Sequence, residues 1–230
     1  VTAPVHEALV GDVIHYLIGG PYLPPDSGVY GTGIDQAGPK FIFFSMAALA
    51  WCAGLNWQPD VVHVHDSHPG AAVYWLGTKG KRDKFWRRTA TALTIHNLPF
   101  QNNHAEKYLA LAGLRPSRYP RLPWWAKDGL MGLAIAHADQ INAVSPGYAA
   151  EIMGEEYGAG LDGLLRARAK RVSGILNGLD YDQADPSTDP ALPVNFDSGS
   201  LDCRSENKTA LQAECGLQQE SAQPLIGVVS

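Results

Sequence analysis

The stretch DVVHVHDSHPGAAVYWLGTKG (60–80) decides the fold that this sequence predicts. Residues 60–65 form a short, nearly continuous apolar run, which is typical of a parallel strand covered on both faces. Residues 69–80 continue with a helical pattern that ends in glycine. Because a strand followed by a helix is the repeating unit of a parallel sheet, this stretch predicts one such unit.

The same alternation recurs along the chain. Further apolar runs are DVIHYLI (12–18), TALTIH (91–96), QINAVS (140–145), VSGILN (172–177) and LIGVVS (225–230). Helical patterns follow at 41–54, 123–138, 145–153, 160–170 and 203–216. Ser145 before Pro146 is a strong helix-start signal, because serine caps the free amides and proline fits the first turn. We therefore expect an α/β fold with a Rossmann-like, doubly wound, mainly parallel sheet.

Residues 1–230 are expected to form a single domain, in which the Pro- and Asp-rich segment 180–200 is a long surface loop. The chain opens on Val1 without an initiator methionine and closes on an apolar run, so we expect it to be truncated at both ends. An unpaired strand at the edge of such a sheet would favour self-association.

Composition excludes several classes of function. The net charge is −5, so no nucleic-acid partner is expected, and the basic run 79–88 is interpreted as a solvated loop. No apolar run reaches the roughly 18 residues of a membrane span, and no signal peptide is visible, so no membrane partner is expected. Three cysteines, an odd number at no metal-like spacing, indicate reduced thiols in a cytosolic protein.

Small or polar residues stand where most of the predicted strands end. They are His65-Asp66, His96-Asn97, Ser145-Pro146, Asn177-Gly178 and Ser230. In an open parallel sheet, ligands bind in the crevice beyond the carboxyl ends of the strands, where helix N-termini also favour phosphate. The sequence therefore predicts a crevice for a polar, phosphorylated ligand.

The cluster HVHDSH (63–68) also resembles a metal site. A zinc site needs three or four converging ligands, and a mid-strand His63, an end-of-strand Asp66 and a helix-start His68 point in different directions. We expect His63 to pack in the core, and we expect no metal. A metal reading would need further ligands, for which His96, His104 and His137 are the candidates.

Longer motifs carry a resemblance to a known family. In order they are QPDVVHVHDSHPG (58–70), TALTIHNLPFQ (91–101), HADQINAVSPGYAAEI (137–152), EYGAGLDGLLRARA (156–169), VSGILNGLDYDQADPSTDP (172–190) and ENKTALQAECGL (206–217). This succession resembles the bacterial glycogen synthases and plant starch synthases, over nearly the whole chain from about Gly28 to Ser230.

The resemblance implies a glycosyltransferase-B fold, with two Rossmann-like domains around a deep cleft. The chain would be most of the N-terminal, acceptor-side domain, and its partner would be the missing C-terminal domain. The implied reaction transfers glucose from ADP-glucose to the non-reducing end of an α-1,4-glucan with retained configuration. No metal or other cofactor is implied, and the location would be the bacterial cytoplasm or, in a plant, the plastid.

The resemblance also implies roles for individual residues. Asp66 matches the family's active-site aspartate, and His96 matches the active-site histidine close to the glucosyl group. Asn97 and Asn177 match polar residues of the nucleotide-sugar site. His68 matches a position beside the acceptor, and Tyr30 in GVYGTG matches a tyrosine near the sugar cleft.

The sequence departs from the family at one telling position, because Ser67 stands where the family has tryptophan. This change would remove an aromatic surface for the glucan. The family's KTGGL loop, its Arg and Lys pair for the diphosphate and its glutamate-bearing segment are absent from these 230 residues. We therefore expect the chain by itself to be inactive. Two other classes of function stay open: a non-catalytic module that binds nucleotide or glucan, and a metal-dependent hydrolase built on HVHDSH.

Overall fold

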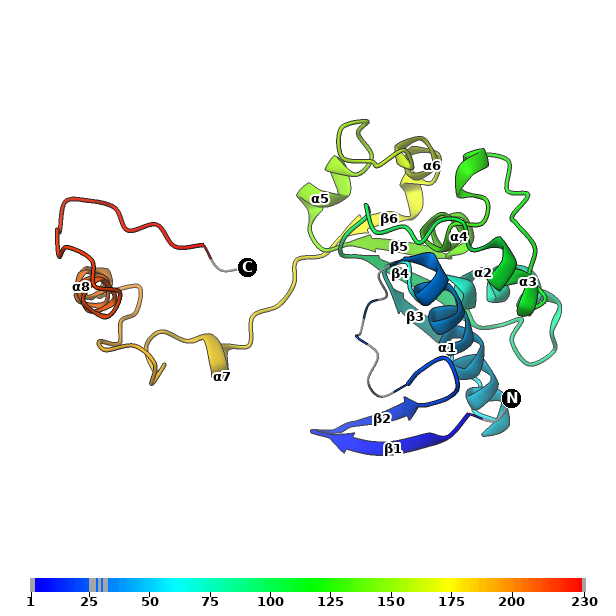
Figure 1. Ribbon diagram of the computed structural model, residues 1–230, viewed down its shortest axis with the longest axis horizontal. Coiled ribbons are helices and arrows are strands. Elements are labelled where there is room, and N and C mark those ends of the chain that lie inside the picture. Colours follow the sequence, from blue (N-terminus) through cyan, green and yellow to red (C-terminus); the bar gives the residue numbers. More distant parts are fainter. Residues whose placement is uncertain (1–2, 25–27, 29, 31–32, 229–230) are drawn as a thin grey trace. The chain divides into compact units, whose positions relative to one another are not determined.

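The computed structural model describes residues 3–24, 28, 30 and 33–228. Their contacts divide the chain into two compact units, Val1–Leu176 and Asn177–Ser230, and each unit is considered by itself. The first unit carries both sheets of the described residues, and the second is built around helix α8 (Figure 1).

The centre of the first unit is a parallel sheet of four strands in the order β3-β4-β5-β6. The strands are β3 (Val61–His65), β4 (Ala90–Ile95), β5 (Gln140–Ala143) and β6 (Val172–Gly174). Each pairs with the next in parallel, as Val61 with Ala90 and Ile141 with Val172 illustrate. This topology confirms the predicted α/β fold with a mainly parallel sheet.

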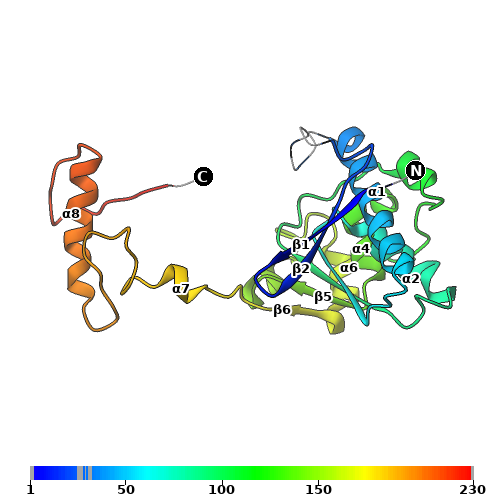
Figure 2. The same ribbon diagram turned by 90° about the horizontal axis from the view of Figure 1, so that it is seen from below.

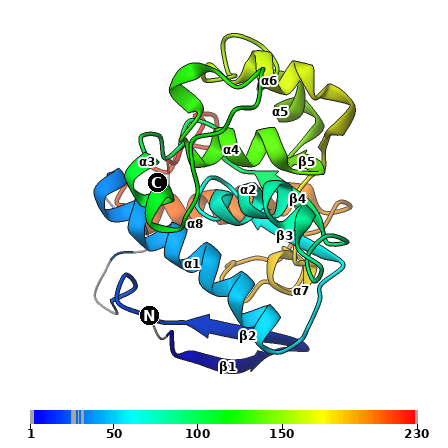
Figure 3. The same cartoon turned by 90° about the vertical axis from the view of Figure 1, so that its right-hand side faces the viewer.

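Three helices lie side by side in one layer: α1 (Ile34–Gly54), α2 (Gly70–Thr78) and α4 (Leu130–His137) (Figure 3). All seven consecutive residues from Leu130 to Ala136 are buried, so α4 is enclosed on every side and forms the middle of the core. Gly70 permits the close approach of α2 to α4, because a Cβ there would lie 2.2 Å from the carbonyl oxygen of Leu130.

Shorter elements complete the first unit. They are α3 (Glu106–Leu111), α5 (Pro146–Glu151), α6 (Asp162–Ala167) and the 3-10 turns η1 (Gly80–Arg82), η2 (Trp124–Ala126) and η3 (Ala169–Arg171). The predicted cap of α5 is confirmed, because the Oγ of Ser145 accepts a hydrogen bond of 2.8 Å from the amide of Tyr148.

The apolar run 12–18 forms a strand, but it does not join the parallel sheet. β1 (Val5–Val10) and β2 (Val13–Ile18) form an antiparallel hairpin of their own. The chain reverses at Gly11, whose φ of +59° glycine adopts without strain, and this turn makes hairpin pairing the local solution. The hairpin leaves Leu9, Val13 and Ile14 exposed, whereas Tyr16 packs its ring 5.6 Å from that of Trp51 on α1.

Two other expectations need correction. The strand predicted at 172–177 ends at Gly174, and residues 225–228 of the predicted last strand have no strand structure, while 229–230 lie outside the described residues. Helix α1 is also long and apolar enough to cross a membrane by length and composition alone, contrary to the expectation that no apolar run reaches about 18 residues. Because α1 packs beside α2 and contributes Ile42 and Leu49 to the core, we interpret it as a covering helix.

The second unit holds α7 (Tyr181–Ala184), the turn η4 (Leu201–Cys203) and α8 (Arg204–Glu214), which Figure 2 shows lengthwise. The predicted loop 180–200 therefore contains one short helix. The side chain of Asn207 on α8 fixes this loop, because it accepts a hydrogen bond from the amide of Val194 and donates one to its carbonyl oxygen, at 3.0 and 2.7 Å.

Candidate active site

A cavity of about 620 Å³ opens beyond the carboxyl ends of β3 and β4. It brings together four of the six residues predicted for the site, namely Asp66, His68, Asn97 and Tyr30. Gly33, Ala37, Phe41, Pro99, Phe100, Gln101 and Asn102 complete its lining. The crevice that the strand ends predicted is therefore present in the first unit.

Asp66 joins the ends of the two strands. Its amide donates a hydrogen bond of 2.8 Å to the carbonyl oxygen of Thr94, and its Oδ1 accepts bonds from the amides of His96 and Asn97 at 2.7 and 3.1 Å. Asp66 adopts a left-handed conformation with φ of +58°, which is uncommon for a residue with a side chain and is concentrated at functional sites. This backbone conformation directs the carboxylate of Asp66 toward the cavity, and its Oδ1 holds the loop after β4 in place.

His96 follows β4 but its ring is not among the groups that line the cavity. Instead, its Nε2 lies 2.9 Å from the Nδ1 of His65, so one of these two rings donates a hydrogen bond to the other. Burial lowers the pKa of His65, and the neighbouring His63 and His96 lower it further. Such a pair is most stable when at least one ring is neutral, since two imidazolium rings have no acceptor nitrogen.

His63 does not lie in the core as expected. It is exposed on the edge strand β3, where no further strand of the described residues pairs outside it, and its Nε2 lies 2.7 Å from the Oγ1 of Thr94. Among the described residues, no group of three His, Cys, Asp or Glu side chains could hold a metal ion. The candidate ligand His137 lies elsewhere, 3.0 Å from the Oγ of Ser117.

Aromatic rings form one wall of the cavity. The ring of His68 lies 4.3 Å from that of Phe41 and 5.2 Å from that of Tyr30, measured between centroids. Burial lowers the pKa of His68, so this imidazole is neutral at pH 7 and can both donate and accept hydrogen bonds. Tyr30 and Phe100 leave much of their rings in solvent, at 71% and 65% exposed.

Ser67 lies away from the cavity. It is fully buried, and its Oγ accepts a hydrogen bond of 2.8 Å from the Nδ2 of Asn102. The side chain of residue 67 therefore points into the protein in this chain, and the expected loss of an aromatic glucan surface stays a prediction. The Ser67–Asn102 bond instead ties the start of α2 to the loop that lines the cavity.

Sequence reasoning missed Phe41, Phe100, Gln101 and Asn102. Three of them belong to the stretch PFQN (99–102), which begins two residues after Asn97, so the loop after β4 was the available signal. Asn177 is exposed in the second unit, and its predicted role in the nucleotide-sugar site stays a prediction.

Comparison with known proteins identifies one consistent group. Residues 1–167 match the family model described as "Starch synthase catalytic domain". The glycogen synthase of Moorella thermoacetica is 41% identical over 205 residues, which cover 88% of this chain and 42% of that protein. The glycogen synthase of Thermotoga maritima is 40% identical over 230 residues, which cover 98% of this chain and 47% of that protein.

A solved structure agrees with these relatives. The catalytic domain of starch synthase IV from Arabidopsis thaliana, bound to ADP and acarbose, superposes with a TM-score of 0.78 at 28% identity, covering 96% of this chain and 46% of that one. This likeness confirms that the fold is that of one half of a glycosyltransferase-B enzyme. The chain spans less than half the length of the relatives that it matches.

Proposed function

This chain belongs to the starch synthase catalytic domain family, and we propose that it forms the acceptor-side half of an enzyme that elongates an α-1,4-glucan. The donor is ADP-glucose, and the glucose is added to the non-reducing end with its configuration retained. The bond between the anomeric carbon and the diphosphate breaks, a bond to the acceptor 4-oxygen forms, and ADP and the hydroxyl proton leave.

The observation that carries this proposal is the fixed carboxylate of Asp66 at the floor of the cavity. Glucosyl transfer builds positive charge on the sugar ring, and an oriented negative charge stabilises that charge without reorganising during the reaction. The amides of His96 and Asn97 hold the carboxylate in place. His68 and Asn97 supply neutral hydrogen-bonding groups beside it for sugar hydroxyls.

The aromatic wall suits the acceptor. A sugar ring presents apolar C–H faces, and pockets for such ligands combine aromatic walls with a few well-placed polar groups. Tyr30, Phe41 and Phe100 supply these walls. The starch synthase IV structure contains ADP and acarbose, which supports a nucleotide and a glucan-like ligand in this family's cleft.

Three further assignments belong to the proposal. His96 acts close to the glucosyl group, Asn97 and Asn177 contact the nucleotide sugar, and no metal or other cofactor takes part. We also propose that the chain by itself binds acceptor without transferring glucose, because its relatives are more than twice as long and a glycosyltransferase-B enzyme needs two domains to form its cleft.

Calorimetry with maltotetraose tests the acceptor assignment. We expect saturable binding by the chain, weakened about tenfold by Tyr30→Ala, since a stacked aromatic contact contributes about 1 kcal/mol or more. Tyr157→Ala is the matched control, because Tyr157 is also largely exposed and does not line the cavity. Absence of saturable binding, or equal weakening by both variants, would show that this cavity is not the acceptor site.

Radiolabelled ADP-glucose tests the catalytic half of the proposal. We expect the chain alone to incorporate no label into glycogen, and turnover by it would contradict the need for a second domain.

The geometry of the described residues does not support the alternative of a metal-dependent hydrolase. Stoichiometric zinc in the purified chain, lost on Asp66→Asn, would revive it.

A further inference from the structure

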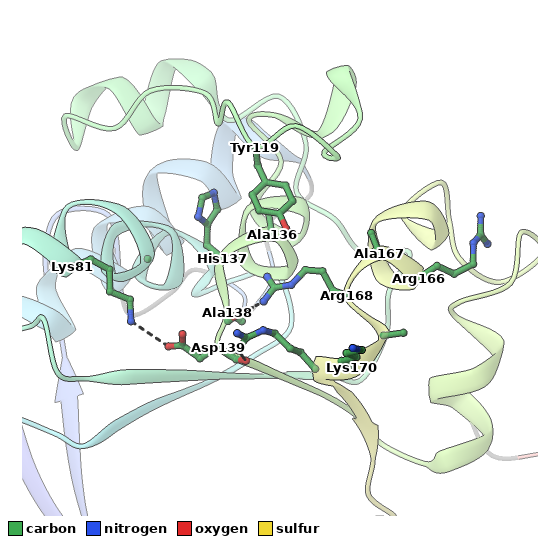
Figure 4. Close-up of a pocket in the computed structure, with 13 residues that line it drawn as sticks. Lys81, Tyr119, Ala136, His137, Ala138, Asp139, Arg166, Ala167, Arg168 and Lys170 are labelled. Carbon is green, nitrogen blue, oxygen red and sulfur yellow. Dashed lines mark hydrogen bonds and ion pairs between the residues drawn. The ribbon is translucent and has the colours of Figure 1, made fainter.

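A second cavity, of about 690 Å³, lies at the opposite edge of the parallel sheet (Figure 4). It is bounded by the C-terminal end of α4, by Asp139 just before β5, and by residues 166–171, which lead into β6. Because these segments precede their strands, the cavity is at the amino edge, whereas Asp66 and Asn97 follow theirs. The two cavities share no lining residue.

The lining of this amino-edge cavity is strongly basic in a chain whose net charge is −5. Its cationic side chains are Lys81, Arg166, Arg168, Lys170 and Arg171. Asp139 is the only acidic residue of the lining, and its carboxylate is already used. Its Oδ2 accepts hydrogen bonds from the amide and the Oγ1 of Thr91 at 2.9 and 3.1 Å and lies 3.5 Å from the Nζ of Lys81.

Two of the arginines are held in place by backbone oxygens. Arg168 donates to the carbonyl oxygens of Ile135 and Ala138, and Arg171 donates to that of Asp139 at 2.6 Å. These bonds cap the end of α4, which is a sufficient structural reason for both side chains. A carbonyl dipole orients a guanidinium group without cancelling its charge, so the positive field of the cavity remains.

Capping explains neither lysine. Lys170 is exposed and makes no hydrogen bond or ion pair with any residue that the structure describes. Lys81 makes only a long ion pair with the carboxylate of Asp139. In Figure 4, Lys81, Arg168 and Lys170 lie around the same hollow, and Arg166 stands at its rim, paired with Asp162 at 2.7 Å. Burial lowers the pKa of Arg168, Tyr119 and Asp139 oppose this shift, and the charge of Arg171 adds to it.

The remaining walls leave room for more than an inorganic ion. Four alanines contribute small side chains to the lining, namely Ala136, Ala138, Ala167 and Ala169. Tyr119 and His137 close one side, and burial together with Arg168 lowers the pKa of His137 to about 4, so this ring is neutral at pH 7. The volume lies within the range of about 300–1,000 Å³ that small-molecule sites occupy.

We propose that the amino-edge cavity binds a small metabolite that carries two phosphate groups or a diphosphate. Two or more phosphate charges match the excess of cations, and charge-assisted hydrogen bonds from lysine and arginine are the usual means of holding them. The site is separate from the proposed acceptor cavity and does not depend on the proposed function. Its ligand would influence catalysis only through the sheet that lies between the two cavities.

Calorimetry with fructose 1,6-bisphosphate tests the proposal, with fructose as the neutral control and about 50 mM NaCl to limit screening. We expect saturable binding of the bisphosphate alone. The variant Lys81→Ala/Lys170→Ala should weaken it at least about tenfold, because two charge-assisted contacts are lost while the capping arginines stay. Lys84→Ala/Arg87→Ala removes two exposed cations that do not line the cavity and should leave the affinity within about twofold.

Three results would overturn the proposal: no saturable binding to the unaltered chain, equal binding of fructose, or equal weakening by the two double variants. The melting temperature of each variant without ligand shows whether it has folded. Should the cavity variant fail to fold, amide NMR of the unaltered chain decides. Shifts on adding the bisphosphate should centre on Ala167 and Ala169, and shifts confined to Asn97 would place the ligand in the other cavity instead.

Discussion

His137 makes the stability of the first unit depend on pH. Its ring is enclosed between Tyr74 and Tyr119, with centroid distances of 4.9 and 5.7 Å, and its Nε2 lies 3.0 Å from the Oγ of Ser117. Burial, and then the charge of Arg168, lower its pKa from 6.5 to about 4. As the pH falls below 6.5, the unfolded chain takes up a proton at this position before the folded chain does.

The sign and size of the effect follow from that difference. A lowered folded-state pKa contributes stability that is fully present above pH 6.5 and is lost as the pH falls toward 4. Linkage with these two values gives a loss of about 2 kcal/mol in the free energy of unfolding between pH 7.5 and pH 5. Most carboxylates remain ionised at pH 5, but His65 and His68, whose pKa values are also lowered, contribute in the same interval, so a variant of His137 is needed to separate its share.

Urea unfolding followed by tryptophan fluorescence measures it, because all six tryptophans lie in the first unit. His137→Gln removes the titration and keeps a polar group near Ser117, so its stability should change about 2 kcal/mol less than that of the unaltered chain over this interval. His15→Gln, on the exposed face of β2, is the matched control and should keep the original dependence. Parallel profiles for the unaltered chain and His137→Gln would refute the argument.

Three further changes test how the fold is held together. Ser67→Ala leaves the side-chain Nδ2 of Asn102 without its hydrogen-bond partner and should lower the free energy of unfolding in urea by about 1–3 kcal/mol. Ser67→Thr, which keeps the hydroxyl, should lower it less. Leu133→Ala opens a cavity in the centre of α4, where the side chain is fully buried, and should cost about 2–5 kcal/mol; a loss below about 1 kcal/mol would show that the core collapses around it. Ser145→Ala removes the bond to the amide of Tyr148 and should cost about 1 kcal/mol, with Ser145→Asp, another good cap, close to neutral.

The parallel strands were predictable because their signal is local. β3, β4 and β5 are nearly continuous apolar runs, each followed within a few residues by a glycine- or proline-marked loop or helix. The hairpin was not predictable, because the apolar run 12–18 has the same pattern whether its partner strand is parallel or antiparallel. Only the tight reversal at Gly11 distinguishes the two, and in β1 the adjacent His6 and Glu7 interrupt the apolar run.

The candidate site was predictable in part for a related reason. Asp66, His68 and Asn97 follow the ends of parallel strands, so the backbone topology alone places them at one edge of the sheet. Strand alternation stops applying at Asp66, whose left-handed φ rotates the next residue inward, so the burial of Ser67 could not be inferred. Phe41 and Phe100 come from a helix and a loop, and nothing local to either sequence shows that their rings face the same cavity.

The bonds of Asp66 have a consequence for the interpretation of mutant kinetics. One carboxylate both faces the proposed acceptor cavity and fixes the loop after β4 to the end of β3. A glutamate would keep the charge but move the oxygen that accepts the two backbone hydrogen bonds by one methylene. An alanine would remove the charge and both hydrogen bonds together. Lost activity in most variants at this position would therefore combine two defects. Asparagine alone separates them, because its amide oxygen can still accept both backbone bonds while the charge is gone.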